Sequence, residues 1–427
     1  MYLADSRGTP DSPDTPDTPH TAGRAAGPGR RAVVPGAVLV LGTVSLVTDV
    51  SSEMVTAVLP LYLVGELGLT PLGFGLLDGV YNGVSALVRL LGGRLSDRRG
   101  GHKAVAAVGY GLSALCKPLL LTVHSLPLIG AVLAADRTGK GLRTAPRDAL
   151  ISLSCAPAAR GRAFGVHRAM DTAGALLGPL AAFVILRIAA GGYDAVFTVS
   201  GCVAALGVLI LLLFAPGRTA RTGPVPECQP RPVRGLLRLT AVRRLTGCAM
   251  LLGLTTVSDS FLYLTLQRRL ELSESWFPLL PLGTAAAFLL LAVPLGVVAD
   301  RIGRRRLFLA GHLALLAAYG LLITSPGGSP VLAGAVLTLH GAFYAATDGV
   351  LAAATADAVP EQLRGSGLAV VQTGQAAARF LCSLAFGAAW TAWGDRTALT
   401  TAAAGLALSA ALSIPLLRPN PTPEQAR

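Results

Sequence analysis

Charged residues are scarce in this chain of 427 residues. Asp, Glu, Lys and Arg together make up 14% of it, whereas soluble globular proteins carry about 25%. Aromatic residues are also few, at 5%, and the mean hydropathy is +0.59. Water is therefore not the only solvent of this chain. Its many Ala, Leu and Val residues and its 50 glycines are typical of closely packed membrane helices.

The positive charges do not form the pattern of a nucleic-acid-binding protein. The net charge is +13, but the basic residues fall in short clusters between long apolar runs, as they do in the cytoplasmic loops of membrane proteins. No basic stripe is interleaved with aromatic residues, so we expect no nucleic-acid partner. Arginine outnumbers lysine by 33 to 3, which suggests a GC-rich bacterial genome.

Sequence patterns of enzymes and metalloproteins are also missing. The six cysteines are scattered, without a CxxC pair, and we interpret them as small packing residues. No HExxH, GxSxG or phosphate-binding P-loop pattern occurs. We therefore expect no catalytic residues, no metal and no cofactor. Because no nucleotide-binding domain is recognisable, an ion gradient remains as the energy source for any active process.

Polar segments divide the chain. Residues 1–32, with the run PDSPDTPDTPHT, and residues 418–427 are expected to be disordered cytoplasmic tails. Residues 217–243 are rich in Pro and Arg and are expected to form a central cytoplasmic loop. The end of this loop, RGLLRLTAVRRL, has the composition of a short basic helix on an anionic membrane surface. The loop separates an N-terminal six-helix bundle, 33–216, from a C-terminal one, 244–417.

Apolar runs long enough to cross a bilayer, about 20 residues, recur throughout both halves. Within 307–347 no residue is charged, and the interruption SPGGSP at 325–330 divides this run into two helices. The sequence predicts an all-α membrane protein with twelve transmembrane helices, at 35–63, 72–94, 104–123, 126–147, 163–187, 194–216, 244–267, 275–299, 307–324, 330–355, 366–390 and 396–417.

The distribution of basic residues predicts the orientation. Most Lys and Arg lie in the tails and in the loops that follow the even-numbered spans, whereas the opposite face carries four, Arg187, Arg268, Arg269 and Arg396. Cytoplasmic loops are the ones enriched in Lys and Arg. We therefore expect a multi-pass protein of the bacterial inner membrane, with both termini in the cytoplasm.

The two halves share an internal repeat at an offset of 203–204 residues. GRLSDRRGGHK at 93–103 aligns with GVVADRIGRRR at 296–306, and RGRAFGV at 160–166 aligns with RGSGLAV at 364–370. Both matches fall in equivalent loops of the two halves. Parallel six-helix repeats of this kind occur in rocker-type transporters, which hold their ligand between the halves.

These features resemble the major facilitator superfamily over residues 33–417. Three motifs carry the resemblance: GRLSDRRGGHK resembles the signature of loop 2–3, RTGKGLRTA at 137–145 resembles the fourth-helix motif, and GALLGP at 174–179 resembles the fifth-helix motif of drug:proton antiporters. The third match is partial, because Ala181 and Ala182 stand where the family usually has further glycines. Its motif residues here are Gly174, Gly178 and Pro179.

The loop 2–3 motif has the chemistry of a cytoplasmic gate. Glycines permit a tight chain reversal, and an acid beside arginines forms a charge latch that holds one conformation and releases in another. The competing interpretation is a solvated turn with arginines that set the topology. The candidate gating residues in the two halves are Gly93, Asp97, Arg98, Gly100, Asp300, Arg301 and Gly303.

Ionisable residues inside the predicted helices need a reason, because a charge at the helix centre costs roughly 2.5–3.5 kcal/mol on insertion scales. The resemblance implies that the first, fourth, seventh and tenth helices line a central cavity. We expect proton-coupling or substrate-binding residues among Asp49, Glu53, Arg137, Lys140, Arg168, Asp171, Asp259 and Asp348.

Two roles remain open for these charges. Burial favours the protonated form of a carboxyl group, whereas a nearby guanidinium favours the charged form. An acid whose arginine contact changes with conformation therefore takes up and releases a proton, and we expect Asp49 or Glu53 to face Arg137 in this way. The alternative is a set of permanent salt bridges between helices. Asp136 and Lys140, four residues apart, are expected to pair with each other.

The sequence favours a secondary transporter that moves a small organic molecule by alternating access. We expect proton-coupled efflux, that is, export of the molecule by antiport with protons. We expect it to work as a monomer in the lipid bilayer. The nearest alternative is a proton symporter or facilitator that imports a polar or anionic metabolite. A membrane-embedded enzyme or sensor is a remote alternative, which predicts a catalytic cluster or an appended domain.

Overall fold

Helices account for nearly all of the described chain. The computed structural model describes residues 35–99, 102–155, 159–189, 192–215, 239–325, 329–359 and 364–417, and no β-strand occurs in these ranges. The predicted all-α class is confirmed. The tails expected at 1–32 and 418–427, and residues 217–238 of the expected central loop, lie outside the described residues.

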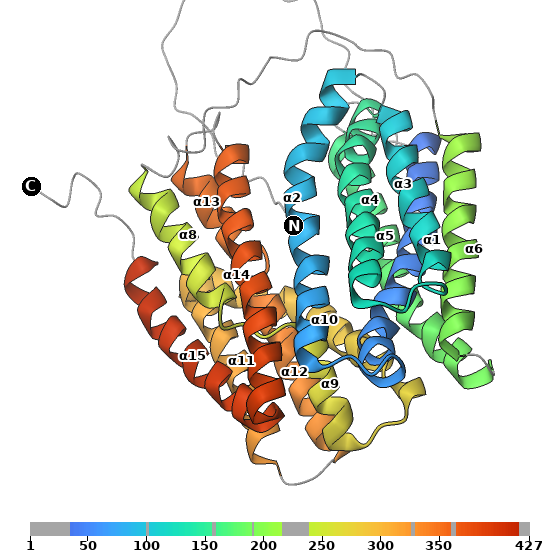
Figure 1. Cartoon of the computed structure of the whole chain (residues 1–427). Helices are drawn as coiled ribbons and strands as arrows, with labels where there is room; N and C mark the ends of the chain where they lie inside the picture. The colour runs from blue at the N-terminus through green and yellow to red at the C-terminus, as the bar shows by residue number, and fades with distance from the viewer. Residues whose placement is uncertain are drawn as a thin grey trace, which may run out of the picture. The chain divides into compact units, whose positions relative to one another are not determined.

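The helices of the first half pack mainly against one another. They are α1 Gly36–Leu61, which continues as the π-helix η1 Tyr62–Glu66, then α2 Pro71–Arg99, α3 His102–Leu119, α4 Leu126–Leu153, α5 Arg160–Ile188 and α6 Gly192–Phe214. Helix α1 packs against α5 and α6, and α4 packs against α2 and α3 (Figure 1).

The second half repeats this plan with two interruptions. Its helices are α8 Thr240–Gly253, α9 Asp259–Leu270, the 3-10 turn η3 Glu274–Trp276, α10 Leu279–Ile302, α11 Arg304–Thr324, α12 Pro330–Thr347, α13 Val350–Ala358, α14 Arg364–Trp393 and α15 Asp395–Leu416. Helix α12 lies between α10 and α11, and α14 packs against α8 and α15. Helix α8 begins at Thr240, three residues before the expected end of the central loop at 243.

The interruptions correct two of the predicted spans, because 244–267 and 330–355 are each divided into two helices. Between α8 and α9 the chain is not helical at 257–258, and the N–H of Val257 bonds to the Tyr319 hydroxyl at 2.9 Å. Between α12 and α13, Gly349 has a φ of +75°, which favours glycine. Non-helical backbone at membrane depth is tolerated where it is buried in protein or lines a cavity.

Seven helical segments of the described chain are long and apolar enough to cross a membrane by length and composition. These are Gly36–Glu66, Arg160–Ile188, Gly192–Phe214, Glu274–Ile302, Arg305–Thr324, Pro330–Thr347 and Asp395–Leu416. The remaining segments of the twelve are more polar or are divided by the interruptions. Some of the polar residues that they contribute line the cavity described below.

Helices α1 and α5 approach closely because glycine occupies their contact. A Cβ atom at Gly178 would lie 2.7 Å from the Cβ of Glu53 and 2.8 Å from the carbonyl oxygen of Val50. Gly174 has the same role one turn earlier, against Leu46. Small residues that let helix backbones approach are a common device of membrane helix packing.

Replacing Gly178 by Leu is expected to separate α1 from α5 and to destabilise the protein by about 1–3 kcal/mol, the usual cost of overpacking. The measurement is the thermal unfolding midpoint in detergent. Gly165→Leu is the matched control, because a Cβ at Gly165 on the same helix meets nothing within 4 Å. Equal midpoints for the two variants would contradict the close packing described here.

The two halves meet where α2 begins. Helices α2 and α14 lie side by side (Figure 1), and the backbone N–H of Leu72 donates to Thr391 Oγ1 at 3.0 Å. A Cβ at Gly75 would overlap the carbonyl oxygen of Ser383, and one at Gly387 would overlap that of Pro71. This contact lies at the end of α2 opposite to the loop 2–3 motif.

A second contact between the halves involves the end of α5 and the start of α6. Phe183 packs against Trp276 with ring centroids 5.4 Å apart, and the Tyr193 hydroxyl donates to Glu274 at 3.0 Å. Both partners in the second half belong to η3, directly before α10. The contact is therefore on the same side as the start of α2.

Candidate functional site

A large cavity lies between the two halves. It consists of two adjoining parts of about 550 and 500 Å³, and such volumes are usual for small-molecule sites. Helices α1, α2 and α4 contribute from the first half, and helices α8 to α14 contribute from the second. The residues that line both parts are Tyr81, Asn82, Thr256, Tyr344, Asp348 and Arg379.

The cavity runs from the contact between α2 and α14 toward the opposite face. At one end it is lined by Asp78 and Ser383, next to the glycine contact described above. At the other end it is lined by Thr355 and Leu368, which flank residues 360–363. The sequence places that loop, the tenth of the chain, in the cytoplasm.

A buried ion cluster joins α3 to α4 beside the cavity. The carboxylate of Asp136 accepts hydrogen bonds from Lys117 Nζ and Ser113 Oγ, each at 2.6 Å, and from Arg137 Nε at 3.0 Å. The guanidinium of Arg137 also stacks on the Tyr81 ring, 3.9 Å from its centroid. The side chains of Asp136, Lys117 and Arg137 are at most 6% exposed, so this cluster is almost completely buried.

Two further ion pairs join α1 to α4, and they differ in exposure. Asp49 Oδ1 lies 3.2 Å from Arg143 Nη2, with side chains 14% and 4% exposed. Glu53 Oε1 lies 3.4 Å from Lys140 Nζ, with side chains 26% and 30% exposed. Glu53 and Lys140 each line a part of the cavity, so this pair is open to the cavity.

Asp171 and Arg168 on α5 lie away from this cavity. Asp171 Oδ1 is 3.5 Å from Arg147 Nη1 on α4, and Arg168 is exposed. Neither residue lines the parts of the cavity described above, and neither does Asp49. Of the eight expected residues, the cavity is lined by Glu53, Arg137, Lys140, Asp259 and Asp348.

Asp259 is the first residue of α9, directly after the first interruption. Its carboxylate accepts the hydroxyl hydrogen of Tyr344, whose oxygen lies 2.7 Å from Oδ1 and 2.8 Å from Oδ2, and His340 Nε2 lies 3.3 Å from Oδ1. Both partners are on α12. The carboxylate therefore ties the two interrupted helices of the second half together.

Asp78 on α2 carries a carboxylate into the contact between the halves. It is buried, and its Oδ2 accepts a hydrogen bond from Ser383 Oγ on α14 at 2.6 Å. Among the described residues no Lys or Arg nitrogen forms an ion pair with it. This bond links the first and second halves at the closed end of the cavity.

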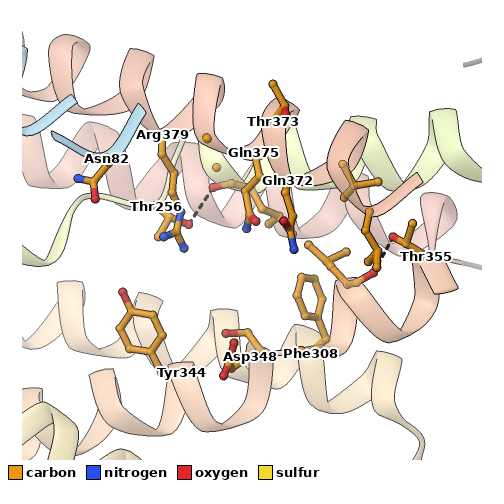
Figure 2. Close-up of a pocket in the computed structure, with 18 of the residues that line it drawn as sticks. Asn82, Thr256, Phe308, Tyr344, Asp348, Thr355, Gln372, Thr373, Gln375 and Arg379 are labelled. Carbon is orange, nitrogen blue, oxygen red and sulfur yellow. Dashed lines mark hydrogen bonds between the residues drawn. The ribbon is translucent and has the colours of Figure 1, made fainter. Parts of the chain in front are cut away.

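Arg379 and Asp348 approach the cavity from opposite sides. Figure 2 shows Arg379, with Gln375 and Gln372, pointing into the cavity from α14, and Asp348 and Tyr344 pointing into it from α12. The Nε of Arg379 is buried without a hydrogen-bond partner. Asp348 is exposed to the cavity at the second interruption. Neither residue belongs to an ion pair among the residues that the structure describes.

Two expected pairings are wrong. Arg137 forms its ion pair with its neighbour Asp136, whereas Asp49 pairs with Arg143 and Glu53 with Lys140. Lys140 pairs with Glu53 on α1 instead of Asp136 on its own helix. The reason is Lys117, which reaches Asp136 from α3 and takes the place that Lys140 was expected to fill.

The motif residues have the following positions. Gly93, expected to permit a chain reversal, lies inside α2, which continues to Arg99, so the chain turns later. Asp97 and Arg98 belong to the last turn of α2, and Gly100 lies outside the described residues. In the second half, Asp300 and Arg301 are exposed at the end of α10, and Gly303 has a φ of +92°. Gly174, Gly178 and Pro179 are buried on α5.

Several residues of the site are not among the expected site residues. Asp78, Tyr344 and Arg379 line the cavity, and His340 lies beside Asp259. Each stands alone in apolar surroundings, without a spacing that points to a partner. Where a partner exists it comes from another helix, as Ser383 does for Asp78. The signal available in the sequence was the rarity of such residues inside apolar helices. No group of three or more His, Cys, Asp or Glu residues suited to a metal ion occurs in the described part of the chain.

Known proteins share this architecture. The chain is similar to the nucleoside transporter NupG, with a TM-score of 0.75 at 14% identity, covering 90% of this chain and all of that one. It is also similar to an inward-facing bacterial homologue of the human lysosomal transporter Spinster, with a TM-score of 0.72 at 15% identity, covering 92% of this chain and all of that one. At these identities the likeness shows the fold alone, and it confirms the expected twelve-helix arrangement in two halves.

Sequence comparison identifies the family. The chain is 29% identical over 363 residues to an MFS-type transporter of Methanocaldococcus jannaschii, covering 83% of this chain and 88% of that protein. The family model of the Major Facilitator Superfamily matches residues 41–289 and again 245–427. With a central cavity between two helical halves and family matches across both, this chain belongs to the Major Facilitator Superfamily.

Proposed function

We propose that the chain is a proton-coupled secondary transporter that moves a small polar organic molecule by alternating access. The observation that carries the proposal is the ion pair of Glu53 and Lys140. This pair joins α1 to α4 and is open to the cavity, whereas the pair of Asp49 with Arg143 and the Asp136 cluster are more buried. Only an exchangeable carboxylate couples proton movement to transport.

The mechanism follows from what protonation does to this pair. A charged Glu53 holds Lys140 and draws α1 toward α4. Protonation of Glu53 cancels the attraction and leaves Lys140 as a free cation in the cavity, which favours a different arrangement of the helices. A carboxylate that meets water on opposite faces in the two conformations carries one proton across per cycle.

With the predicted topology, we infer that the cavity opens toward the cytoplasm, as in an inward-facing state. The contact between α2 and α14 closes the outer end of the cavity, and the cavity extends toward the cytoplasmic loops. We propose that Asp97 with Arg98, and Asp300 with Arg301, form the latch that closes this cytoplasmic end in the opposite state. The protein would work as a monomer in the bacterial inner membrane, with both termini in the cytoplasm.

Efflux by antiport is the direction that we propose, because GALLGP resembles the fifth-helix motif of drug:proton antiporters. Import of a polar metabolite by symport, or its facilitated passage, is the second candidate. The uncommitted cation Arg379 in the cavity favours it, because such a residue attracts an anionic metabolite. The direction of proton movement separates these two candidates.

Glu53→Gln is expected to abolish proton movement coupled to substrate in liposomes that contain a pH-sensitive dye. A proton gradient is imposed, and anionic, zwitterionic and cationic compounds are added in turn. Proton flux opposite to the substrate indicates antiport, and flux in the same direction indicates symport. Asp194→Asn is the matched control, because Asp194 is an exposed carboxylate at the start of α6. Substrate-dependent proton flux that persists in Glu53→Gln would refute the coupling role.

A further inference from the structure

We propose that the cavity binds a zwitterion, with the anionic group on Arg379 and the cationic group on Asp348. The inference rests on the proposed transport function and specifies its substrate class. It assigns the two ends of the ligand to α14 and α12, on the two sides of the cavity seen in Figure 2.

Arg379 is the first part of the argument. It lines both parts of the cavity, its Nε is buried without a hydrogen-bond partner, and no carboxylate of the described chain forms an ion pair with it. A charge within a membrane protein is costly unless something pairs with it. A guanidinium offers a planar pair of donors that suits a carboxylate or phosphate, so an anionic group of the ligand supplies the missing partner.

Asp348 is the second part. The interruption at Gly349 ends α12 here, and the backbone N–H of Asp348 is satisfied by the carbonyl oxygen of Tyr344 at 2.8 Å. The side chain has no such partner and is exposed to the cavity. A carboxylate in this position accepts hydrogen bonds from an ammonium group.

The other cavity charges are already committed. Lys140 pairs with Glu53, and Arg137 pairs with Asp136. Asp259 accepts the hydroxyl hydrogen of Tyr344, and Asp78 accepts a hydrogen bond from Ser383 Oγ. Among the described cavity residues this leaves one cation and one carboxylate without a partner, on opposite walls. A purely anionic ligand would leave Asp348 without a partner, and a purely cationic ligand would leave Arg379 without one.

The remaining lining is suited to a compact, polar ligand. Gln372 and Gln375 on α14 and Thr256 after α8 offer amide and hydroxyl groups, which hydrogen-bond without adding charge. Phe308 offers an apolar surface on the opposite wall (Figure 2). A cavity of about 550 Å³ accommodates a molecule of amino-acid to small-peptide size.

The test measures binding without a gradient, so that it does not depend on proton coupling. Purified full-length protein in detergent is titrated with the twenty standard amino acids and with short ω-amino acids. Each is accompanied by its matched amine without the carboxylate and its matched acid without the amine. Ligand-induced change of the thermal unfolding midpoint gives the apparent affinity. The variants are Arg379→Gln and Asp348→Asn, with Arg187→Gln and Asp194→Asn as exposed controls.

We expect one or more zwitterions to bind more tightly than both matched analogues. Each cavity variant should weaken zwitterion binding at least about tenfold, the effect of losing a hydrogen bond to a charged group. Arg379→Gln should leave binding of the amine unchanged, and Asp348→Asn should leave binding of the acid unchanged. The exposed controls should match the wild type.

Two outcomes would overturn the inference. One is the absence of any zwitterion that binds better than its amine and its acid. The other is that each variant weakens binding of the amine and binding of the acid equally. This result would show that Arg379 and Asp348 pair with each other and not with the two ends of the ligand. The binding assay and the proton-flux assay separate the two proposals. Zwitterion binding by the wild type without coupled proton flux would refute the coupling proposal alone, whereas coupled flux without a preference for zwitterions would refute the substrate assignment alone.

Discussion

Asp136→Asn is expected to cause the largest loss of stability of any single carboxylate change in the first half. The carboxylate is shared by Lys117 and Arg137, and all three side chains are almost completely buried. The amide that replaces it carries no charge, so two buried cations lose their partner at once. Removing one partner of a buried ion pair costs about 3–5 kcal/mol. The thermal unfolding midpoint in detergent measures this loss.

A graded series tests the assignment. Lys117→Met removes one cation and leaves Asp136 paired with Arg137, so it should cost clearly less than Asp136→Asn. Asp194→Asn changes the same chemical group on the surface and should have almost no effect. If Asp136→Asn and Lys117→Met have the same small effect, the cluster does not stabilise the bundle in the way the geometry indicates.

Gly387→Leu is expected to shift the conformational equilibrium away from the state described here. At Gly387 any Cβ overlaps the carbonyl oxygen of Pro71, so the side chain pushes α14 from α2 at the closed end of the cavity. Overpacking costs about 1–3 kcal/mol, and the opposite state, in which these helices separate, does not bear this cost. The ratio of the two states should therefore change by about 5–150-fold.

Labelling of a cavity residue reports this shift. Gln372→Cys, in a background without the six native cysteines, places a thiol on the exposed cavity face of α14. In inside-out vesicles, a membrane-impermeant maleimide should label it more slowly when Gly387→Leu is also present. Gly334→Leu is the control, because a Cβ at Gly334 meets nothing within 4 Å. An unchanged labelling rate in correctly folded protein would argue against the closing contact.

The fold could be predicted from sequence because its determinants are local or repeated. Apolar runs of membrane length mark the helices, and the repeat of GRLSDRRGGHK in the second half relates the two bundles. The predicted span 126–147 and the observed α4 Leu126–Leu153 share their first residue. Such agreement is expected where length and apolar composition decide the outcome.

The pairing of the charges could not be predicted, because it depends on contacts between helices. Asp136 and Lys140 have the spacing of a helical ion pair, yet each is bound by a residue from another helix, Lys117 or Glu53. The helix interruptions were equally hidden. The stretch that contains Thr256 and Val257 is apolar and contains no proline that would mark a helix end. The N–H of Val257 donates instead to the hydroxyl of Tyr319, a residue distant in sequence.

The interruptions have a mechanical consequence. Both divide helices of the second half, whereas α4 of the first half is continuous and is tied to its neighbours by the Asp136 cluster and by the pairs of Asp49 and Glu53. The halves are therefore unequal in stiffness. We therefore expect the first half to serve as a rigid wall and the second to contain the joints at which a helix bends around a ligand. If so, occlusion of the substrate is the task of one half alone.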